Sequence, residues 1–213
     1  MEKSLRVSFE ELGGRVASVW EGLRPSTRGL VERALQPAPA PVGSQSRAAY
    51  DARSEWELSR LLAALDDRAA EAGQQQQQVL SAEQSSELLR MADACAFVLQ
   101  HEARTAEVFA QLLERALRAS DYARVDLIAD TITARLAPSE ICELARNPAP
   151  ALRAIAQEAL AQKPTSALID LLGDPVDAHV ARHALEIQAD DYGSEEAGWV
   201  VNTLERADES DEA

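Results

Sequence analysis

The segment Pro138-Ser139, which continues to Ile141, Leu144 and Asn147-Pro148, is echoed by Pro164-Thr165, which continues to Leu168, Leu171 and Asp174-Pro175. The first proline recurs from position 138 to 164 and the second from 148 to 175, an offset of 26 to 27 residues. A recurrence of about 20–50 residues built from helical patterns is typical of stacked helical repeats. The echo therefore predicts an architecture that offers a surface rather than a catalytic pocket.

Each copy of the echo predicts a pair of helices. The short first helices are expected at about 140–146 and 166–173, and the second helices at about 149–162 and 176–189. In the second copy, Asp174 is expected to cap free amide groups and Pro175 to take the first helical position. Upstream, residues 79–136 alternate helical patterns with short breaks, and the low aromatic content of 4% favours close-packed helices over sheets.

The second copy, Ala167 to Pro175 followed by Val180 and Ala184-Leu185, resembles a HEAT-type repeat in the short variant of phycobilin-lyase-like HEAT proteins. The first copy is similar to it through Asn147-Pro148, Leu152-Arg153 and Ala159-Leu160. The resemblance is best over residues 138–204. It implies an all-α fold, an α-solenoid of HEAT-like helical hairpins whose concave side holds proteins and sometimes other ligands. It implies a shape and no catalytic residue.

The pattern divides the chain into four parts. Residues 1–35 form an N-terminal helical arm, residues 36–47 a Pro/Ala-rich linker, residues 48–206 the HEAT-like solenoid, and residues 207–213 an acidic tail that we expect to be disordered. In the arm, apolar residues recur in steps of 4, 3, 4, 3 and 4 on one helix face. They are Leu5, Phe9, Leu12, Val16, Val19 and Leu23.

This heptad face of the arm has two interpretations. It folds back and packs on the first helices of the solenoid, or it pairs with a partner helix or with a second copy of the chain. The second interpretation makes the six residues candidate partner-binding residues and makes the protein a homo-oligomer through its N-terminal helix. It predicts that deleting residues 1–47 lowers the oligomeric order without unfolding the rest.

A second candidate site is a stripe of polar residues on one predicted helix. His179, His183, Glu186 and Asp190 follow one another in steps of 4, 3 and 4, which places them on one narrow face. Two histidines at i and i+4 can chelate a divalent metal, and carboxylates can complete the ligand set. The alternative is a solvated stripe with weak His–carboxylate pairs. The segment from His179 to His183 lacks the glutamate of a His-Glu-x-x-His hydrolase.

Charge and composition argue against several classes of protein. The net charge of −15 argues against a nucleic-acid partner. Residues 1–47 carry a charge of +2 and residues 186–213 a charge of −9. No apolar run approaches the ~20 residues of a membrane span. Cys95 and Cys142 are too few for a disulfide framework, and we expect them to be buried thiols in a cytoplasmic protein.

These features predict a non-catalytic scaffold or adaptor that binds another protein, with no cofactor. Two alternatives remain. One is a lyase-like solenoid that holds a small ligand or metal beside His179 and His183. The other is a self-assembling subunit that uses the heptad arm.

Overall fold

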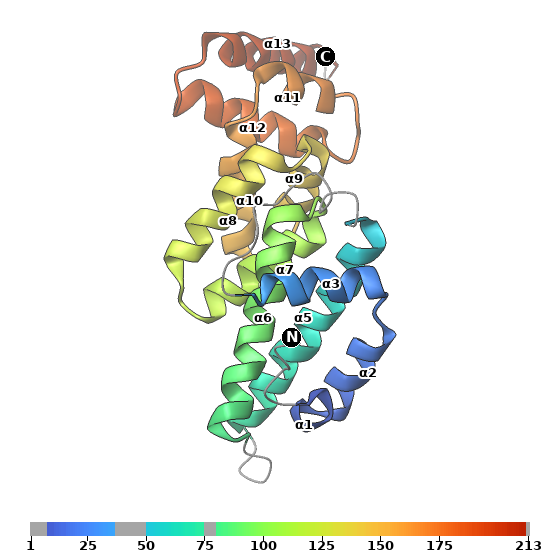
Figure 1. The fold of residues 1–213 in the computed structure, drawn as a ribbon. Coiled ribbons are helices and arrows are strands. Elements are labelled where there is room, and N and C mark those ends of the chain that lie inside the picture. The colour runs from blue at the N-terminus through green and yellow to red at the C-terminus, as the bar shows by residue number, and fades with distance from the viewer. Residues whose placement is uncertain (1–7, 37–49, 75–79, 212–213) are drawn as a thin grey trace. The chain divides into compact units, whose positions relative to one another are not determined.

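The structure is a computed structural model that describes residues 8–36, 50–74 and 80–211, and within these ranges every regular element is an α-helix (Figure 1). The all-α prediction is therefore confirmed. The chain divides into two compact units, Met1–Ala103 and Arg104–Ala213. The predicted linker lies outside the described residues except for Gln36. The described arm belongs to the first unit, together with the first part of the predicted solenoid.

Unit 1 is built on two long helices that lie side by side, α5 (Ala52–Gln74) and α6 (Ala82–Glu102). Three shorter helices pack on them: α1 (Phe9–Leu12), α2 (Gly14–Gly22) and α3 (Pro25–Ala34). In α5, the fully buried leucines at positions 58, 61, 62 and 65 follow the spacing that gathers apolar side chains on one helical face. The α2 helix contacts α5, and α3 contacts both α5 and α6.

The arm is broken at Gly13, where the sequence pattern predicts one continuous helix. Ser8 and Glu11 form a capping box, in which each side chain accepts a hydrogen bond from the other residue's backbone amide. Gly13 then adopts a φ of +134°, and α2 begins at the next residue. On the other side of this turn, the Nε of Arg68 donates to the carbonyl oxygen of Leu12 at 2.8 Å. The break turns α1 away from α2 and lets both helices reach the α5–α6 pair.

Replacing Gly13 with alanine is expected to lower the stability of unit 1 by about 1–3 kcal/mol, because a φ of +134° is strained for any residue with a Cβ. The new Cβ would also lie 3.2 Å from the Nε of Arg68. Gly14 is the matched control, since nothing lies within 4 Å of its Cβ position. Gly14→Ala should leave stability unchanged or raise it by up to about 1 kcal/mol. Thermal unfolding measures both, and an equal effect of the two substitutions would refute this account of the turn.

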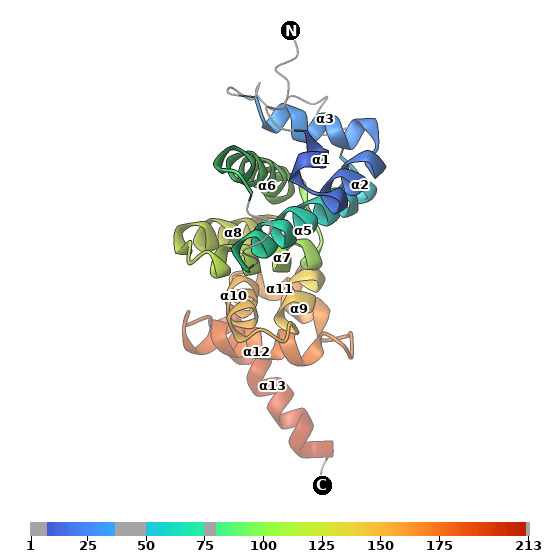
Figure 2. The same cartoon turned by 90° about the horizontal axis from the view of Figure 1, so that it is seen from below.

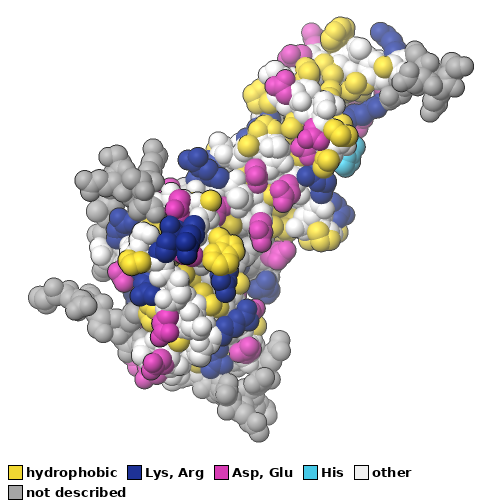
Figure 3. All heavy atoms as spheres, turned by 90° about the vertical axis from the view of Figure 1, so that its right-hand side faces the viewer, with side chains coloured by type: hydrophobic (Ala, Val, Ile, Leu, Met, Phe, Trp, Pro, Cys, Tyr) yellow, Lys and Arg dark blue, Asp and Glu magenta, His cyan; other side chains and the backbone are white. Residues whose placement is uncertain are grey.

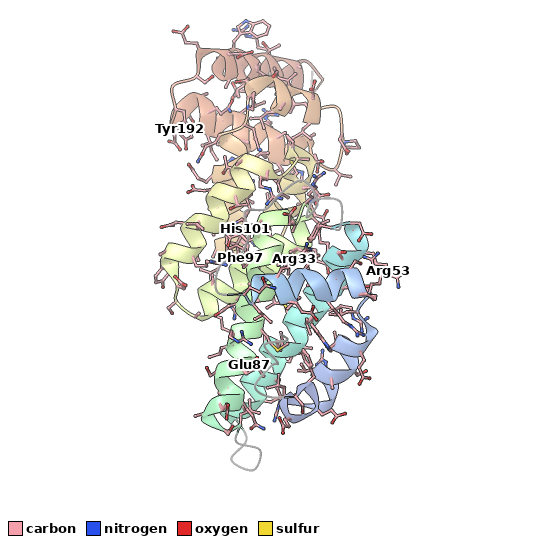
Figure 4. All side chains as sticks on the ribbon, in the orientation of Figure 1. Arg33, Arg53, Glu87, Phe97, His101 and Tyr192 are labelled. Carbon is pink, nitrogen blue, oxygen red and sulfur yellow. The ribbon has the colours of Figure 1, made fainter. Side chains whose placement is uncertain are left out.

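A polar network joins the arm to the start of α5. Glu57, a buried residue of α5, accepts hydrogen bonds from the Thr27 hydroxyl at 2.5 Å and from the Arg24 Nε at 3.3 Å. Burial alone would raise the pKa of Glu57, but these hydrogen bonds hold it below its ordinary value. Arg24 also donates two hydrogen bonds to Asp51, at 2.5 and 3.0 Å. Arg53, which Figure 4 labels on α5, pairs with Glu57 at 3.2 Å. The network fixes the α2–α3 connection to α5.

The network makes the stability of unit 1 depend on acid. The hydrogen bonds that Asp51 accepts from Arg24 and from the amide of Ser54 hold its pKa well below the ordinary range. A lowered carboxyl pKa adds stability above about pH 4, and this stability is lost as the pH falls further. We therefore expect Asp51→Asn to unfold more easily than the wild type at pH 7 and to approach it below pH 4. Urea unfolding at a series of pH values tests this, and a difference that is independent of pH would contradict it.

Unit 2 consists of seven helices in the described residues, and they contact one another largely in the order of the chain. Their bounds are α7 (Ala106–Arg118), α8 (Tyr122–Arg135), α9 (Pro138–Ala145), α10 (Pro150–Ala161), α11 (Thr165–Leu171), α12 (Ala178–Asp190) and α13 (Glu195–Asp211). The helices α7 and α8, α9 and α10, and α11 and α12 form contacting pairs. Between pairs, α9 contacts α7 and α11, while α10 contacts α8 and α12.

The unit therefore has two layers, α7–α9–α11 and α8–α10–α12, and α13 packs on α12 at its outer end (Figure 2). Its core is made of side chains such as Phe109, Leu113, Ile128 and Ile132, all of which are fully buried. The helix α13 continues to Asp211, whereas the sequence pattern predicts a helix end near 206 and a disordered tail from 207. Polar composition alone therefore predicts an end of this helix that lies too early in the chain.

Candidate protein-binding surface

Both copies of the sequence echo contain the same local turn. The side-chain oxygen of Asn147 accepts the amide of Ala149 at 2.9 Å, and that of Asp174 accepts the amide of Val176 at 2.8 Å. These turns explain the repeated Asn-Pro and Asp-Pro steps, because a short polar side chain bonded two residues ahead reverses the chain. The predicted cap at Asp174 with Pro175 as the first helical residue was wrong. The helix α12 begins three residues later, after Asp177.

Polar side chains connect each helix pair of unit 2 to the next one. Asp177, which is buried, forms an ion pair with Arg146 from the turn between α9 and α10. The Nζ of Lys163 donates to the carbonyl oxygens of Thr133 and Leu136 at 2.5 and 3.0 Å, and so satisfies the carboxyl end of α8. Burial lowers the pKa of this lysine. These contacts fix the spacing between successive pairs.

Gln188, a buried residue of α12, makes the corresponding contact at the end of α10. Its amide nitrogen donates to the carbonyl oxygens of Ala161 and Lys163 at 2.8 and 2.6 Å, and its amide oxygen accepts from the Thr165 hydroxyl at 3.1 Å. Both donors and the acceptor of one side chain are thus used on the α10–α11 connection. Gln188 and Lys163 together hold three consecutive helix pairs in register.

The layer α8–α10–α12 exposes apolar and aromatic side chains on its outer face. Tyr122 and Leu127 of α8 are 67% and 54% exposed, although Val125, Ile128 and Ile132 on the same helix are buried. Tyr192, labelled in Figure 4, follows α12 and donates its hydroxyl proton to Glu158 of α10. This hydrogen bond raises the pKa of Tyr192. We use the term outer face for the exposed side chains of α8, α10 and α12, together with Tyr192. Its residues are carried by three helices that the core and the polar contacts hold in place.

The predicted histidine stripe lies on this outer face and is open to solvent. His179 and His183 are exposed, and the Nδ1 of His183 lies 3.3 Å from the Oε2 of Glu186. Asp190 is also exposed, at the end of α12. Among the residues that the structure describes, no three His, Cys, Asp or Glu side chains gather as a metal site requires. The metal-binding role of His179 and His183 stays a prediction, and the observed pair is the weak His–carboxylate contact of the alternative.

The heptad face of the arm is largely used within unit 1. Leu12, Val16 and Leu23 are buried. Phe9 and Val19 are partly buried, and the ring of Phe9 stacks on that of Trp20 with centroids 4.2 Å apart. Leu5 lies outside the described residues. The arm thus packs on α5 and α6, as the first interpretation of this face expects, and the partner-binding role of the six residues stays a prediction.

Two further features of the described residues are a pair of cysteines and a polar cavity in unit 1. Cys95 and Cys142 are buried thiols, as the sequence predicts, and burial raises the pKa of Cys142 to about 12. A cavity of about 300 Å³ in unit 1 is lined by charged residues that include Glu10, Arg15, Asp67 and Arg68. Arg15 already pairs with Asp67 at 2.8 Å. Figure 3 shows acidic and basic side chains interspersed on the face it presents.

The exposed aromatic residues were not singled out by the sequence pattern. Trp199, for example, is 71% exposed on α13. The polar contacts of Lys163 and Gln188 were also missed, although Lys163 is one of only two lysines in a chain with 21 basic residues.

Comparisons with family models, curated proteins and solved structures found no match to this chain. Within the described residues, no helix is both long and apolar enough to cross a membrane.

Proposed function

We propose that this protein is a non-catalytic scaffold or adaptor, and that unit 2 is a short HEAT-like α-solenoid that binds another protein on the outer face. The observation that supports this best is the two-layer order of the helix pairs, in which every pair contacts the next. Repeats of this kind bury their apolar sides against their neighbours and leave a continuous surface for a partner. The exposed Tyr122 and Leu127 lie on that surface, and tyrosine is among the residues enriched in interfaces.

The surface fits protein recognition better than chemistry. It carries aromatic, aliphatic and charged side chains on rigid helices, which are the components of an anchored interface with a polar rim. The solvent-exposed His183–Glu186 pair lacks the burial that makes a catalytic acid or base effective.

A matched pair of leucines tests the proposed function. Tagged protein is purified from its native host, and the proteins that it retains are identified by mass spectrometry. Leu127→Asp on α8 should abolish the retention of the partner, whereas Leu89→Asp on α6, a leucine that is 52% exposed in unit 1, should preserve it. Equal retention by both variants, or no retained protein with the wild type, would overturn the proposal.

A further inference from the structure

Trp199 lies on the side of α13 opposite the side that packs on α12. Ala197 is fully buried against α12, and Trp199 lies two residues further, about 200° around the helix axis. Val200 lies on the flank of the helix, between the side of Ala197 and the side of Trp199, and it is partly buried. At 71%, Trp199 is the most exposed of the large apolar residues that the structure describes. The folding of unit 2 therefore gives no reason for a tryptophan at this position.

The three tryptophans of the chain have different surroundings. Trp20 has the guanidinium of Arg28 at 5.9 Å from its ring centroid, and Trp56 has that of Arg60 at 4.5 Å. Trp199 instead has Glu195 and Glu196 one turn before it on the same exposed side of α13. One turn after it, the Thr203 hydroxyl donates to the Trp199 carbonyl oxygen and is thus used within the helix itself. The helix thus presents two carboxylate residues one turn before the exposed indole, and the group that best complements this arrangement is a cation.

The charge of this part of the chain selects the kind of partner. Residues 186–213 contain ten acidic residues and one basic residue. Two copies of this segment would repel each other, and so would this segment and an anionic lipid surface or a nucleic acid. A basic segment would be attracted, and its Lys or Arg side chains would gain cation–π contacts with the indole ring.

We propose that the exposed side of α13 docks a basic, amphipathic segment of a partner protein. Trp199 is the anchor, and Glu195 and Glu196 supply the complementary charges. This inference rests on the proposed function, because it gives the chemistry of the partner and adds α13 to the surface that binds it. Tryptophan is the residue type most typical of an interface hot spot, and the surrounding charges steer the partner and fix its orientation.

The test is a titration of the full chain with a synthetic peptide of about 18 residues, which is five helical turns. Its sequence places Leu on one face of the helix and Lys on the opposite face. Calorimetry should show binding that weakens as salt is added. Trp199→Ala, which leaves the charge unchanged, should weaken the affinity about tenfold or more. Trp56→Ala is the matched control and should leave it within about twofold, because Trp56 already has Arg60 above its ring. Binding by Trp199→Ala at the wild-type affinity would overturn the proposal.

A second pair of variants separates a docking site from general attraction to an acidic protein. Glu195→Lys with Glu196→Lys should abolish binding of the peptide. Glu114→Lys with Glu143→Lys makes the same change in net charge on α7 and α9, where both residues are exposed, and should have a small effect. Equal losses in the two double variants would show non-specific attraction and overturn the proposal. Self-association of the wild type that Trp199→Ala abolishes would do the same, because it would make a second copy the occupant.

The natural partner distinguishes this inference from the proposed function. A partner that Leu127→Asp loses and Trp199→Ala retains would overturn the role of α13 and leave the scaffold function standing. Loss of the partner by Trp199→Ala, with retention by Trp56→Ala, would support both. A wild-type protein that retains no partner but binds the basic peptide through Trp199 would contradict the proposed function alone.

Discussion

Removal of residues 1–47 is expected to unfold unit 1. The arm contributes Leu12, Val16, Leu30 and Val31 to the core, each of them at most 4% exposed. The loss of these four side chains alone removes about 6 kcal/mol or more of apolar burial. It also uncovers the faces of α5 and α6 on which they pack and leaves Glu57 without Arg24 and Thr27. A loss of this size is comparable with the whole stability of a small domain, ~5–15 kcal/mol.

Hydrogen exchange measures this result helix by helix. The amides of α5 and α6 should lose their protection in the truncated protein, while those of α9 and α10 in unit 2 should keep theirs and serve as the internal control. The heptad pattern alone predicts the opposite, a shortened protein that stays folded and only changes its oligomeric state. Full protection of α5 and α6 after truncation would show that the arm is an appendage and would contradict the structure.

The second large effect is expected at Gln188. Gln188→Leu keeps the approximate volume of the side chain but leaves the carbonyl oxygens of Ala161 and Lys163 without their donor. Since an unsatisfied buried polar group costs about 1–3 kcal/mol, we expect a loss of about 2–3 kcal/mol in the stability of unit 2. The loss should fall on the connection between α10 and α11, where hydrogen exchange should increase first.

Gln162→Leu is the matched control for this substitution. Gln162 also lies at the end of α10, but it is exposed, and its amide nitrogen donates to the side chain of Glu158 at 3.0 Å. Its replacement should change the stability by no more than about 0.5 kcal/mol, as is usual for a surface site. Urea unfolding of the two variants side by side measures both values. Equal effects would mean that Gln188 does not hold the helix pairs of unit 2 together.

The sequence predicts the elements of this fold better than their connections. Apolar spacing places the helices, and the capping boxes at Ser8 and Ser81 join residues only three positions apart, so both features depend on residues close together in the chain. The break at Gly13 was missed since it depends on Arg68 of α5, more than fifty residues away. The assignment of the arm to unit 1 rests in the same way on long-range contacts, which the heptad pattern cannot choose between.

The candidate surface was predicted only in outline. A repeat in the sequence predicts stacked helix pairs, but it does not say which side of each helix stays exposed. Trp199 shows the reason, because only the packing of α13 on α12 places this residue on the solvent side of its helix. Lys163 and Gln188 are polar residues whose partners are backbone carbonyls, and such acceptors leave no mark in a sequence pattern.

The central claim is that successive helix pairs of unit 2 are joined to one another in chain order. A double-mutant cycle on Arg146 and Asp177 tests it most directly, because this ion pair connects the α9–α10 turn to the start of α12. Unfolding free energies are measured for Arg146→Met, Asp177→Asn and the double variant. We predict a coupling energy of about 1–3 kcal/mol, as residues in direct contact show. A coupling of zero would mean that the two turns do not meet, and the stacked arrangement on which the proposed function depends would be wrong.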